Sequence, residues 1–285
     1  MKIELMDKNL YEKLINEKEG SLTVHSVFNQ ACNLYTPQGI WLTLVSKHRW
    51  LPPNGVKLNH SRDFRDCYRQ DERIRFSFRD QKIKRLDLNL HSLKINQKES
   101  WNNKKLKLEY MKAYLELQGQ SEAIGNLELP EGVEASFRSI DKALEENNLE
   151  KIKKAARGLI GFGSGLTPSM DDYLTGRILM WKIWTMQSAT RGEEDYSRVI
   201  KEASEGRTTT ASEWMIRFAA EGRCSEEIIN FLHFYFSQSS GDEFEEAFRE
   251  VLSIGSTSGE DLMYGMWSEG TRLLKKYEGG KSEWD

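Results

Sequence analysis

The spacing of hydrophobic residues divides the chain into two parts. From residue 21 to about residue 95, apolar and polar positions alternate with the period of β-strands. The alternation is clearest at 22–28 and 74–78, and the run at 40–45 is rich in residues that favour strands. Turn sequences rich in proline and glycine, at 36–39 and 52–55, separate these runs. We therefore predict a small antiparallel β sheet or barrel in an N-terminal domain, residues 1–97.

After about residue 98 the apolar positions recur every three to four residues, which is the period of amphipathic helices. The predicted helices lie around 106–115 and 133–144 and at 149–159, 170–186, 196–203, 211–220, 225–236, 243–254 and 260–277. The fold class is therefore α+β, with a larger, mostly α-helical domain at 98–278 and a tail at 279–285.

Composition and charge narrow the functional classes. The chain has 285 residues, of which 30% are charged, and its formal net charge is −3. This balance does not favour a general nucleic-acid binder or a protein of anionic membrane surfaces. Its cysteines, Cys32, Cys67 and Cys224, are far apart and odd in number, which indicates reduced thiols. With no signal core and no apolar run long enough to span a membrane, we expect a cytoplasmic protein.

A glycine-rich loop lies between two of the predicted helices. Gly161, Gly163 and Gly165 precede the helix that begins near Pro168, and glycines let backbone N–H groups approach a ligand. The spacing differs from the Gly-x-Gly-x-x-Gly of dinucleotide sites, and the Gly-Lys-Ser at 280–282 follows no strand. Neither familiar nucleotide loop is therefore predicted.

Helix capping offers a purely structural interpretation of the same segment. Thr167 can cap the following helix, or Ser169 can cap it with Asp172 completing a capping box. Thr209, with its neighbours Thr208 and Thr210, can cap another helix in the same way. Capping explains the hydroxyls and the acid, but it leaves the three glycines unexplained.

A second copy of the motif occurs late in the chain. Residues 258–265 align without a gap to 169–176 in the frame Ser, any, acid, Asp, any, Leu or Met, any, Gly. We predict that two related helix starts face one another across a pseudo-symmetric cleft. The alternative interpretation predicts that the starts lie apart, with hydroxyls facing their own helices.

The charges at this cleft leave the ligand open. Helix N-termini and glycine loops attract an anion, whereas the acidic side chains repel one. A phosphate bridged by Mg²⁺ would satisfy both, and so would a neutral carboxamide whose N–H₂ donates to a carboxylate. We predict catalytic or ligand-orienting roles for Asp171, Asp172 and Asp261. The predicted ligand-binding residues here are Gly163, Ser164, Gly165, Thr167, Ser169, Thr208, Thr209, Ser256, Thr257 and Ser258.

In these motifs the chain resembles the AllH-like family, which was catalogued as an uncharacterised domain and is linked to a subunit of oxamate carbamoyltransferase. The matching segments are 25–33, 53–55, 163–172, 208–212, 219–222 and 254–261. The resemblance adds Asn33 and Asn54 to the candidate ligand-binding residues. It implies carbamoyl transfer between oxamate and phosphate in purine and allantoin catabolism, within an oligomer of partner subunits. The family pattern has Gly at the position of Met170 and His at that of Ser256, so the substrate or the activity can differ here.

Two functions follow from these observations. The first is an enzyme or enzyme subunit, a transferase related to carbamoyl transfer, that binds a small carboxylate, carboxamide or phosphate at a helix N-terminus. Its cofactor would be Mg²⁺ or none. The second is a non-catalytic assembly or ligand-binding subunit whose motifs are helix caps.

Overall fold

A computed structural model describes residues 2–14, 19–77, 83–95, 98–118, 124, 128–187 and 194–278. The predicted tail at 279–285 lies outside these residues. The chain forms two compact units, residues 1–92 with 223–229 and residues 93–222 with 230–285. The sequence patterns did not predict that 223–229 would join the first unit.

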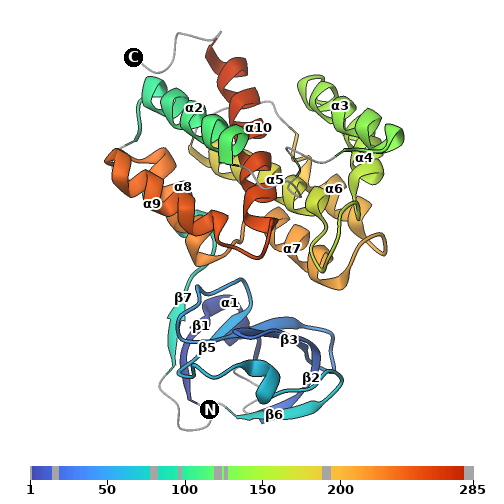
Figure 1. Cartoon of the computed structure of the whole chain (residues 1–285), viewed down its shortest axis with the longest axis vertical. Coiled ribbons are helices and arrows are strands. Elements are labelled where there is room, and N and C mark those ends of the chain that lie inside the picture. The colour runs from blue at the N-terminus through green and yellow to red at the C-terminus, as the bar shows by residue number, and fades with distance from the viewer. Residues whose placement is uncertain are drawn as a thin grey trace. The chain divides into compact units, whose positions relative to one another are not determined.

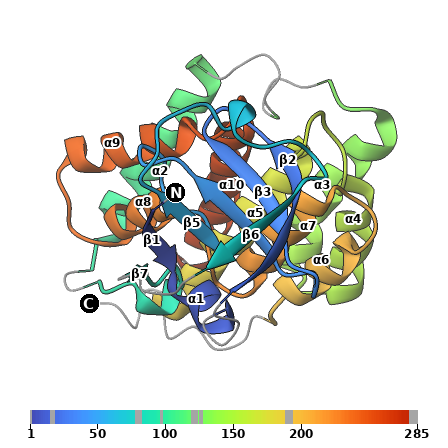
Figure 2. The same cartoon turned by 90° about the horizontal axis from the view of Figure 1, so that it is seen from below.

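The first unit is built on one curled sheet of seven strands (Figure 1). The sheet has the order β6-β2-β3-β4-β5-β1-β7. Its elements are β1 (Ile3–Asp7), α1 (Lys8–Leu14), β2 (Glu19–Val27), β3 (Ala31–Tyr35), β4 (Trp41–Val45), β5 (Gly55–Leu58), β6 (Arg73–Ser77) and β7 (Lys84–Leu86). The strands can be followed from a second direction in Figure 2. The predicted β-rich unit is confirmed, but the sheet is mixed, because β4 pairs with β5 and β1 with β7 in parallel.

Period-two alternation builds the core of this sheet. Val24, Cys32 and Leu34 are fully buried at alternating positions of β2 and β3, and their neighbours along each strand are half-buried. The turn at 36–39 ends in Gly39 with φ 79°, and the Gly39 N–H donates to the Thr36 carbonyl at 2.9 Å. The turn chemistry expected from the sequence is therefore present.

Asn54 ties the segment 223–229 to the sheet. Its backbone has φ 53°, a conformation that asparagine tolerates, and the residue is fully buried. Its side chain donates to the Trp41 carbonyl at 2.7 Å and accepts from Arg223 at 2.8 Å. Arg223 also pairs with Asp7, and Asp7 accepts the Asn54 N–H at 2.6 Å. These bonds satisfy a buried charge pair inside the first unit.

The second unit is helical. Its described part contains nine helices: α2 (Trp101–Gln118), α3 (Glu131–Glu145), α4 (Leu149–Leu159), α5 (Ser169–Gln187), α6 (Ser197–Ser204), α7 (Thr210–Ala220), the later part of α8 (Glu226–Phe236), α9 (Gly241–Leu252) and α10 (Ser258–Glu278). Each predicted helical segment from 149 to 277 corresponds to one of them within a few residues. The helical character of this region is confirmed.

Helix α5 lies at the centre of the unit, in contact with α10 along its length (Figure 1). Nearly every residue from Ser169 to Trp184 is buried, on all faces of α5. A helix that is buried all round needs neighbours on every side. Helices α4, α7 and α10 contact it, and α2 and α9 in turn contact α10. The two copies of the sequence motif therefore begin the two helices that form the core of the unit.

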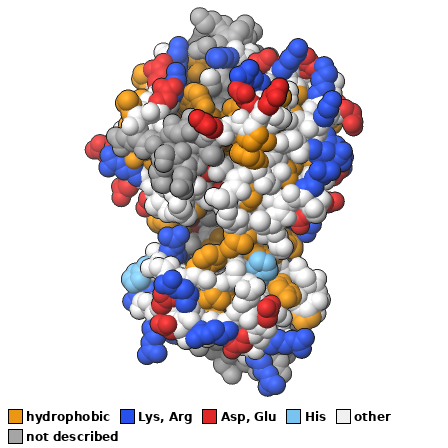
Figure 3. Space-filling view, turned by 45° about the vertical axis from the view of Figure 1, so that its right-hand side comes forward, with side chains coloured by type: hydrophobic (Ala, Val, Ile, Leu, Met, Phe, Trp, Pro, Cys, Tyr) orange, Lys and Arg blue, Asp and Glu red, His pale blue; other side chains and the backbone are white. Residues whose placement is uncertain are grey.

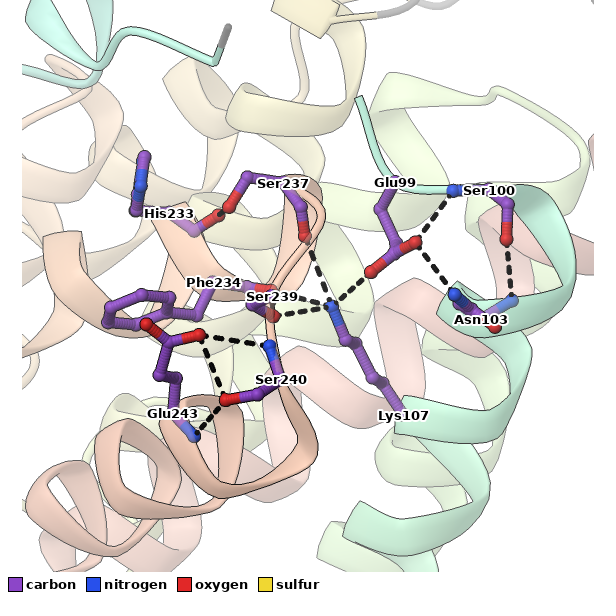
Figure 4. Close-up of polar contacts among 10 residues, drawn as sticks. All are labelled: Glu99, Ser100, Asn103, Lys107, His233, Phe234, Ser237, Ser239, Ser240 and Glu243. Atoms are coloured by element: carbon purple, nitrogen blue, oxygen red, sulfur yellow. Dashed lines mark hydrogen bonds and ion pairs between the residues drawn. The ribbon is translucent and has the colours of Figure 1, made fainter. Parts of the chain in front are cut away.

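A buried lysine joins α2 to the end of α8 (Figure 4). The Lys107 ammonium pairs with Glu99 at 2.6 Å and donates to the Phe234 carbonyl at 2.7 Å and the Ser239 hydroxyl at 3.1 Å. Carbonyls at a helix C-terminus lack intrahelical partners, so an ammonium there satisfies both groups. This cluster stabilises the fold, and none of its residues belongs to the repeated motif.

Charges of both signs are intermingled on the face of the helical unit that Figure 3 shows, in keeping with the net charge of −3. In the part of the chain that the structure describes, no helix has the length and apolar character needed to cross a membrane.

Candidate functional site

Helices α5 and α10 cross in close contact through two glycines. A Cβ atom at Gly176 would lie 2.0 Å from the Leu262 carbonyl oxygen, and one at Gly265 would lie 2.0 Å from the Tyr173 carbonyl oxygen. The two contacts are reciprocal, because each glycine meets the residue three positions before the glycine of the other helix. The crossing thus follows the predicted pseudo-symmetry of the repeated motif, and only glycine fits at either position.

The hydroxyl groups of each motif face the other helix. Thr167 and Ser258 share a hydrogen bond of 2.8 Å between their hydroxyl oxygens. The Ser258 hydroxyl bonds to Asp172, and the Ser169 hydroxyl bonds to Asp261. Ser258 and Ser169 occupy the same position of the repeat, as do Asp172 and Asp261. The interpretation that these starts lie apart, with hydroxyls that only cap their own helices, is therefore wrong for this pair.

The two carboxyls are buried and incompletely bonded. Asp172 is 1% exposed and Asp261 is 0% exposed. Oδ2 of each has no hydrogen-bond partner among the residues that the structure describes. Burial raises the pKa of Asp172 well above its usual value, and the neighbouring Asp261 and Asp171 raise it further. Burial also raises the pKa of Asp261, while the Ile124 N–H at 2.6 Å opposes this change.

Asp171 has a different environment from Asp172. Its Oδ1 accepts the Gly161 N–H at 2.9 Å, and its Oδ2 accepts the Thr208 hydroxyl. Burial raises the pKa of Asp171, and these two bonds lower it. Both oxygens are occupied, and these bonds hold the glycine-rich loop against the start of α7; the catalytic or ligand-orienting role of Asp171 stays a prediction.

The structure explains two of the three glycines by close backbone approach. A Cβ at Gly161 would lie 2.7 Å from the Arg207 carbonyl oxygen, and one at Gly163 would lie 2.3 Å from the Ser169 nitrogen. Both residues have positive φ, 81° and 124°. Gly165, with φ 87°, has no atom within 4 Å of the added Cβ. Close backbone approach therefore accounts for Gly161 and Gly163 but not for Gly165.

Exposed residues precede the buried carboxyls along the chain in both copies of the motif. Gly163, Ser164 and Gly165 are exposed before α5, and Ser256 is exposed before α10. Thr257, half-buried, bonds to Asp261. These residues were predicted to bind a ligand, and that role stays a prediction.

Thr209 caps helix α7 and also connects it to the glycine-rich loop. Its hydroxyl accepts the Ser212 N–H at 3.1 Å, which is the predicted cap of α7, and donates to the Leu166 carbonyl at 2.5 Å. With the bond from Thr208 to Asp171, the start of α7 is thereby connected to the glycine-rich loop.

The two predicted site residues of the first unit have bonds inside their own sheet. Asn33 on β3 donates to Ser26 at 3.0 Å and accepts from Thr43 at 2.8 Å, across three adjacent strands. Asn54 forms the bonds described above. In both residues the amide is used to join parts of the sheet.

The sequence patterns did not identify a buried charge cluster on the same two helices. Arg177 of α5 pairs with Glu269 of α10 at 2.9 Å and with Asp141 at 2.5 Å, and donates to the Tyr173 hydroxyl at 2.7 Å. Arg272 completes the cluster by pairing with Glu269. The sequence signal that could have identified this cluster is a charged residue, Arg177, inside an otherwise apolar helical pattern.

The motif residues form no metal-ligand cluster in the described ranges and lie outside the two surface hollows described here. No set of three or more His, Cys, Asp or Glu side chains suited to a metal ion occurs in the described ranges. Two hollows, of about 610 Å³ along α9 and about 440 Å³ inside the curled sheet, are lined by none of the motif residues. The two carboxyls are buried and line neither of these hollows.

Comparison with known proteins gives two family matches that together span both units. Residues 159–269 match the family model described as oxamate carbamoyltransferase subunit AllH, and residues 2–117 match the AllH family N-terminal domain. The first match contains both copies of the motif, and no solved structure matches the chain.

Proposed function

We propose a function from two premises: the chain belongs to the AllH-like family, whose model is described as an oxamate carbamoyltransferase subunit, and its repeated motif forms one buried site. On this basis the protein is a subunit related to carbamoyl transfer that binds a small carboxylate, carboxamide or phosphate. It works in the cytoplasm with partner subunits.

One observation carries the proposal. Asp172 and Asp261 come from two motifs 89 positions apart in the chain, yet each is bonded by the serine of the other motif. A packing role alone does not require buried carboxyls with free oxygens, because unsatisfied buried polar groups destabilise a fold. Such groups are kept where they bind or react.

The roles divide according to the bonding of each group. Asp172 and Asp261 orient the ligand, and the backbone N–H groups of Gly163 to Gly165 and the hydroxyls of Thr167 and Ser258 line its approach. Developing negative charge would be stabilised by the loop amides at the N-terminus of α5. If Mg²⁺ takes part, Asp172 and Asp261 would hold it, and it would supply positive charge for a phosphate ligand.

Calorimetric titration with oxamate, carbamoyl phosphate and phosphate, with and without Mg²⁺, tests this function. We expect at least one ligand to bind, and the Asp172→Asn variant to lose at least about tenfold in affinity, because an amide cannot offer the ligand the same hydrogen-bonding groups as the carboxyl. Asp242→Asn, an exposed carboxyl in the first turn of α9, is the matched control and should bind as the original protein does. Equal affinity in both variants would reject the site.

The bonding of Asp171 favours a second candidate, a non-catalytic assembly subunit. Gly161, Gly163 and Asp171 all serve backbone packing, as a purely structural loop would. This candidate predicts that none of the three ligands binds and that Asp172→Asn leaves the activity of the assembled complex unchanged.

A further inference from the structure

Helix α2 carries a second lysine, Lys104, one turn before the buried Lys107. The side chain of Lys104 is half-buried, and its ammonium has no hydrogen-bond acceptor among the residues that the structure describes. Its Nζ atom lies 5.7 Å from the ring centre of Trp184 on α5 and 5.4 Å from that of Phe236 on α8. Both rings are buried, and they pack edge to face with their centres 5.7 Å apart. The amine is therefore held against an apolar aromatic surface.

The carboxylate that acts on Lys104 is already bonded to other groups. This carboxylate is Glu99, whose negative charge favours the protonated amine. Its Oε2 accepts from Lys107 at 2.6 Å, and its Oε1 accepts the Ser100 N–H at 2.9 Å and the Asn103 amide at 3.0 Å (Figure 4). Lys104 thus exchanges part of its hydration for aromatic rings without gaining an acceptor of its own. The charged form of this amine is therefore poorly compensated.

Positive charge beside Lys104 acts in the same direction as burial. Lys107 follows Lys104 by three residues, so the two side chains are neighbours on the surface of α2. Their ammoniums also meet consecutive residues at the end of α8, because Lys107 donates to the Ser237 carbonyl at 3.3 Å and Lys104 covers the ring of Phe236. The pKa of Lys104 is lowered to about 8, mainly by burial and further by the charges of Lys98 and Lys107.

A lowered pKa changes the chemistry that is open to an amine. At pH 7 an amine with a pKa of about 8 is neutral in roughly a tenth of the molecules, compared with less than about 0.1% for an ordinary lysine. Only the neutral amine has the lone pair that attacks an electrophile. Lysines become nucleophiles where an apolar surface or a second cation disfavours their charge, and Lys104 has both.

We propose that Lys104 is a nucleophilic amine that forms a Schiff base with a small apolar aldehyde, and is thus a covalent modification site outside the repeated motif. A small electrophile is required because the side chain is half-buried. The rings of Trp184 and Phe236 favour an apolar one, since its hydrocarbon part can pack against them. This site does not depend on the proposed function, because its residues lie outside both motifs.

The reaction needs no oxidant or reductant. The neutral Nζ attacks the aldehyde carbon, the π pair of the carbonyl moves to its oxygen, and one proton passes from nitrogen to oxygen to give a carbinolamine. The hydroxyl group and the remaining N–H proton then leave as water, and the nitrogen lone pair forms the C=N bond. The products are the Schiff base and one water molecule.

Treatment of the full chain with propanal at pH 7, followed by borohydride reduction and peptide mass spectrometry, tests the site. Lys112, with 52% of its side chain exposed on the same helix, is the internal control. We expect Lys104 to be modified at least about tenfold faster than Lys112, because its neutral fraction is larger. Lys104→Arg should take up one aldehyde fewer than the original protein in the same time, and Lys112→Arg should take up the same number.

The pH dependence of acetylation by acetic anhydride, which reacts only with neutral amines, tests the cause. The rate at Lys104 should reach half of its maximum near pH 8. Three results would overturn the proposal: equal aldehyde rates at Lys104 and Lys112, unchanged uptake in Lys104→Arg, or a midpoint near the ordinary lysine value of about 10.4. The last result would show that Lys104 is a permanent cation held by the two rings.

Discussion

Helices α5 and α10 carry two buried groups of charged residues with opposite bonding. At the glycine crossing, Asp172 and Asp261 each keep an oxygen without a partner among the described residues, and the charged groups that shift the pKa of Asp172 are acidic. Further along, Arg177 and Glu269 are equally buried, with 1% and 0% of their side chains exposed, yet they form a closed network. The helices and burial are the same, so what separates the two groups is charge compensation. The compensated group stabilises the fold, and the uncompensated one is the site at which we propose that a ligand binds.

The largest expected effect comes from breaking the compensated group. Arg177→Met leaves Glu269 buried with only Arg272, and leaves the Tyr173 hydroxyl without its donor. We expect the free energy of unfolding to fall by about 3–5 kcal/mol, because removing one partner strands the others. Urea unfolding measures this change.

Arg138→Gln is the control for that variant, since Arg138 forms an exposed pair with Glu134. Its loss should change stability by less than about 1 kcal/mol. If both variants unfold at the same urea concentration, the buried ion pairs of Arg177 contribute no more to stability than the exposed pair of Arg138.

The next largest effect is expected from a substitution at the crossing of α5 and α10. Gly265→Ala places a methyl group where the Tyr173 carbonyl now lies, so the helices must separate. We expect a loss of about 2–3 kcal/mol in stability together with loss of ligand binding, because overpacking at a backbone contact displaces both aspartates. Thermal unfolding and calorimetry follow the two effects.

Gly132→Ala is the matched substitution in α3, where a Cβ meets no atom within 4 Å. It should be neutral or slightly stabilising, because alanine has the higher helix propensity. A similar loss in both variants would show that the loss in Gly265→Ala does not arise from the helix crossing.

The uncompensated group should respond in the opposite direction from Arg177. Burial raises the pKa of Asp172 well above its value in the unfolded chain. The stability that it contributes is therefore complete below the unfolded pKa and is lost as pH rises through the folded pKa. Asp172→Asn removes that loss and should stabilise the protein by about 1–3 kcal/mol near pH 7, with the difference vanishing towards about pH 4.

Unfolding midpoints across that pH range check the sign. A variant that is less stable than the original at neutral pH, by the same amount at every pH, would show that Asp172 is a structural hydrogen-bond acceptor.

The smallest effect concerns the loop. Thr208→Val removes the hydroxyl that Asp171 accepts, and we expect about 1 kcal/mol of destabilisation, the value of one hydrogen bond. Thr210→Val, at an exposed position in the first turn of α7, is the control. Ligand affinity should fall less than in Asp172→Asn, because Thr208 acts on the loop and not on the ligand.

The sequence predicted the elements whose patterns are local. Helix α4 was predicted with its observed bounds, 149–159, since its amphipathic period is regular, and in the structure Asn148 caps it. Strands β1 and β5 were missed, because each is short and is stabilised by pairing with the other. The parallel pairs were missed for the same reason.

The motif alignment predicted which helix starts meet but not how they meet. Gly176 and Gly265 were recognised only as the last positions of a frame, because a close helix approach depends on a partner that the local sequence does not contain. Likewise, the bonds of the Asn54 amide to Trp41 and Arg223 were not predicted, because Arg223 is far away in the chain; the ligand-binding role of Asn54 stays a prediction.

The reciprocal glycine contacts also limit how the helices can move. A carbonyl of each helix sits where the other has no side chain, so sliding either helix by one residue would bring a Cβ against a backbone oxygen. Two such contacts together fix the position and the angle at which the helices cross. The aspartates beside them are therefore preorganised, and a ligand that fits them would bind without a reorganisation penalty.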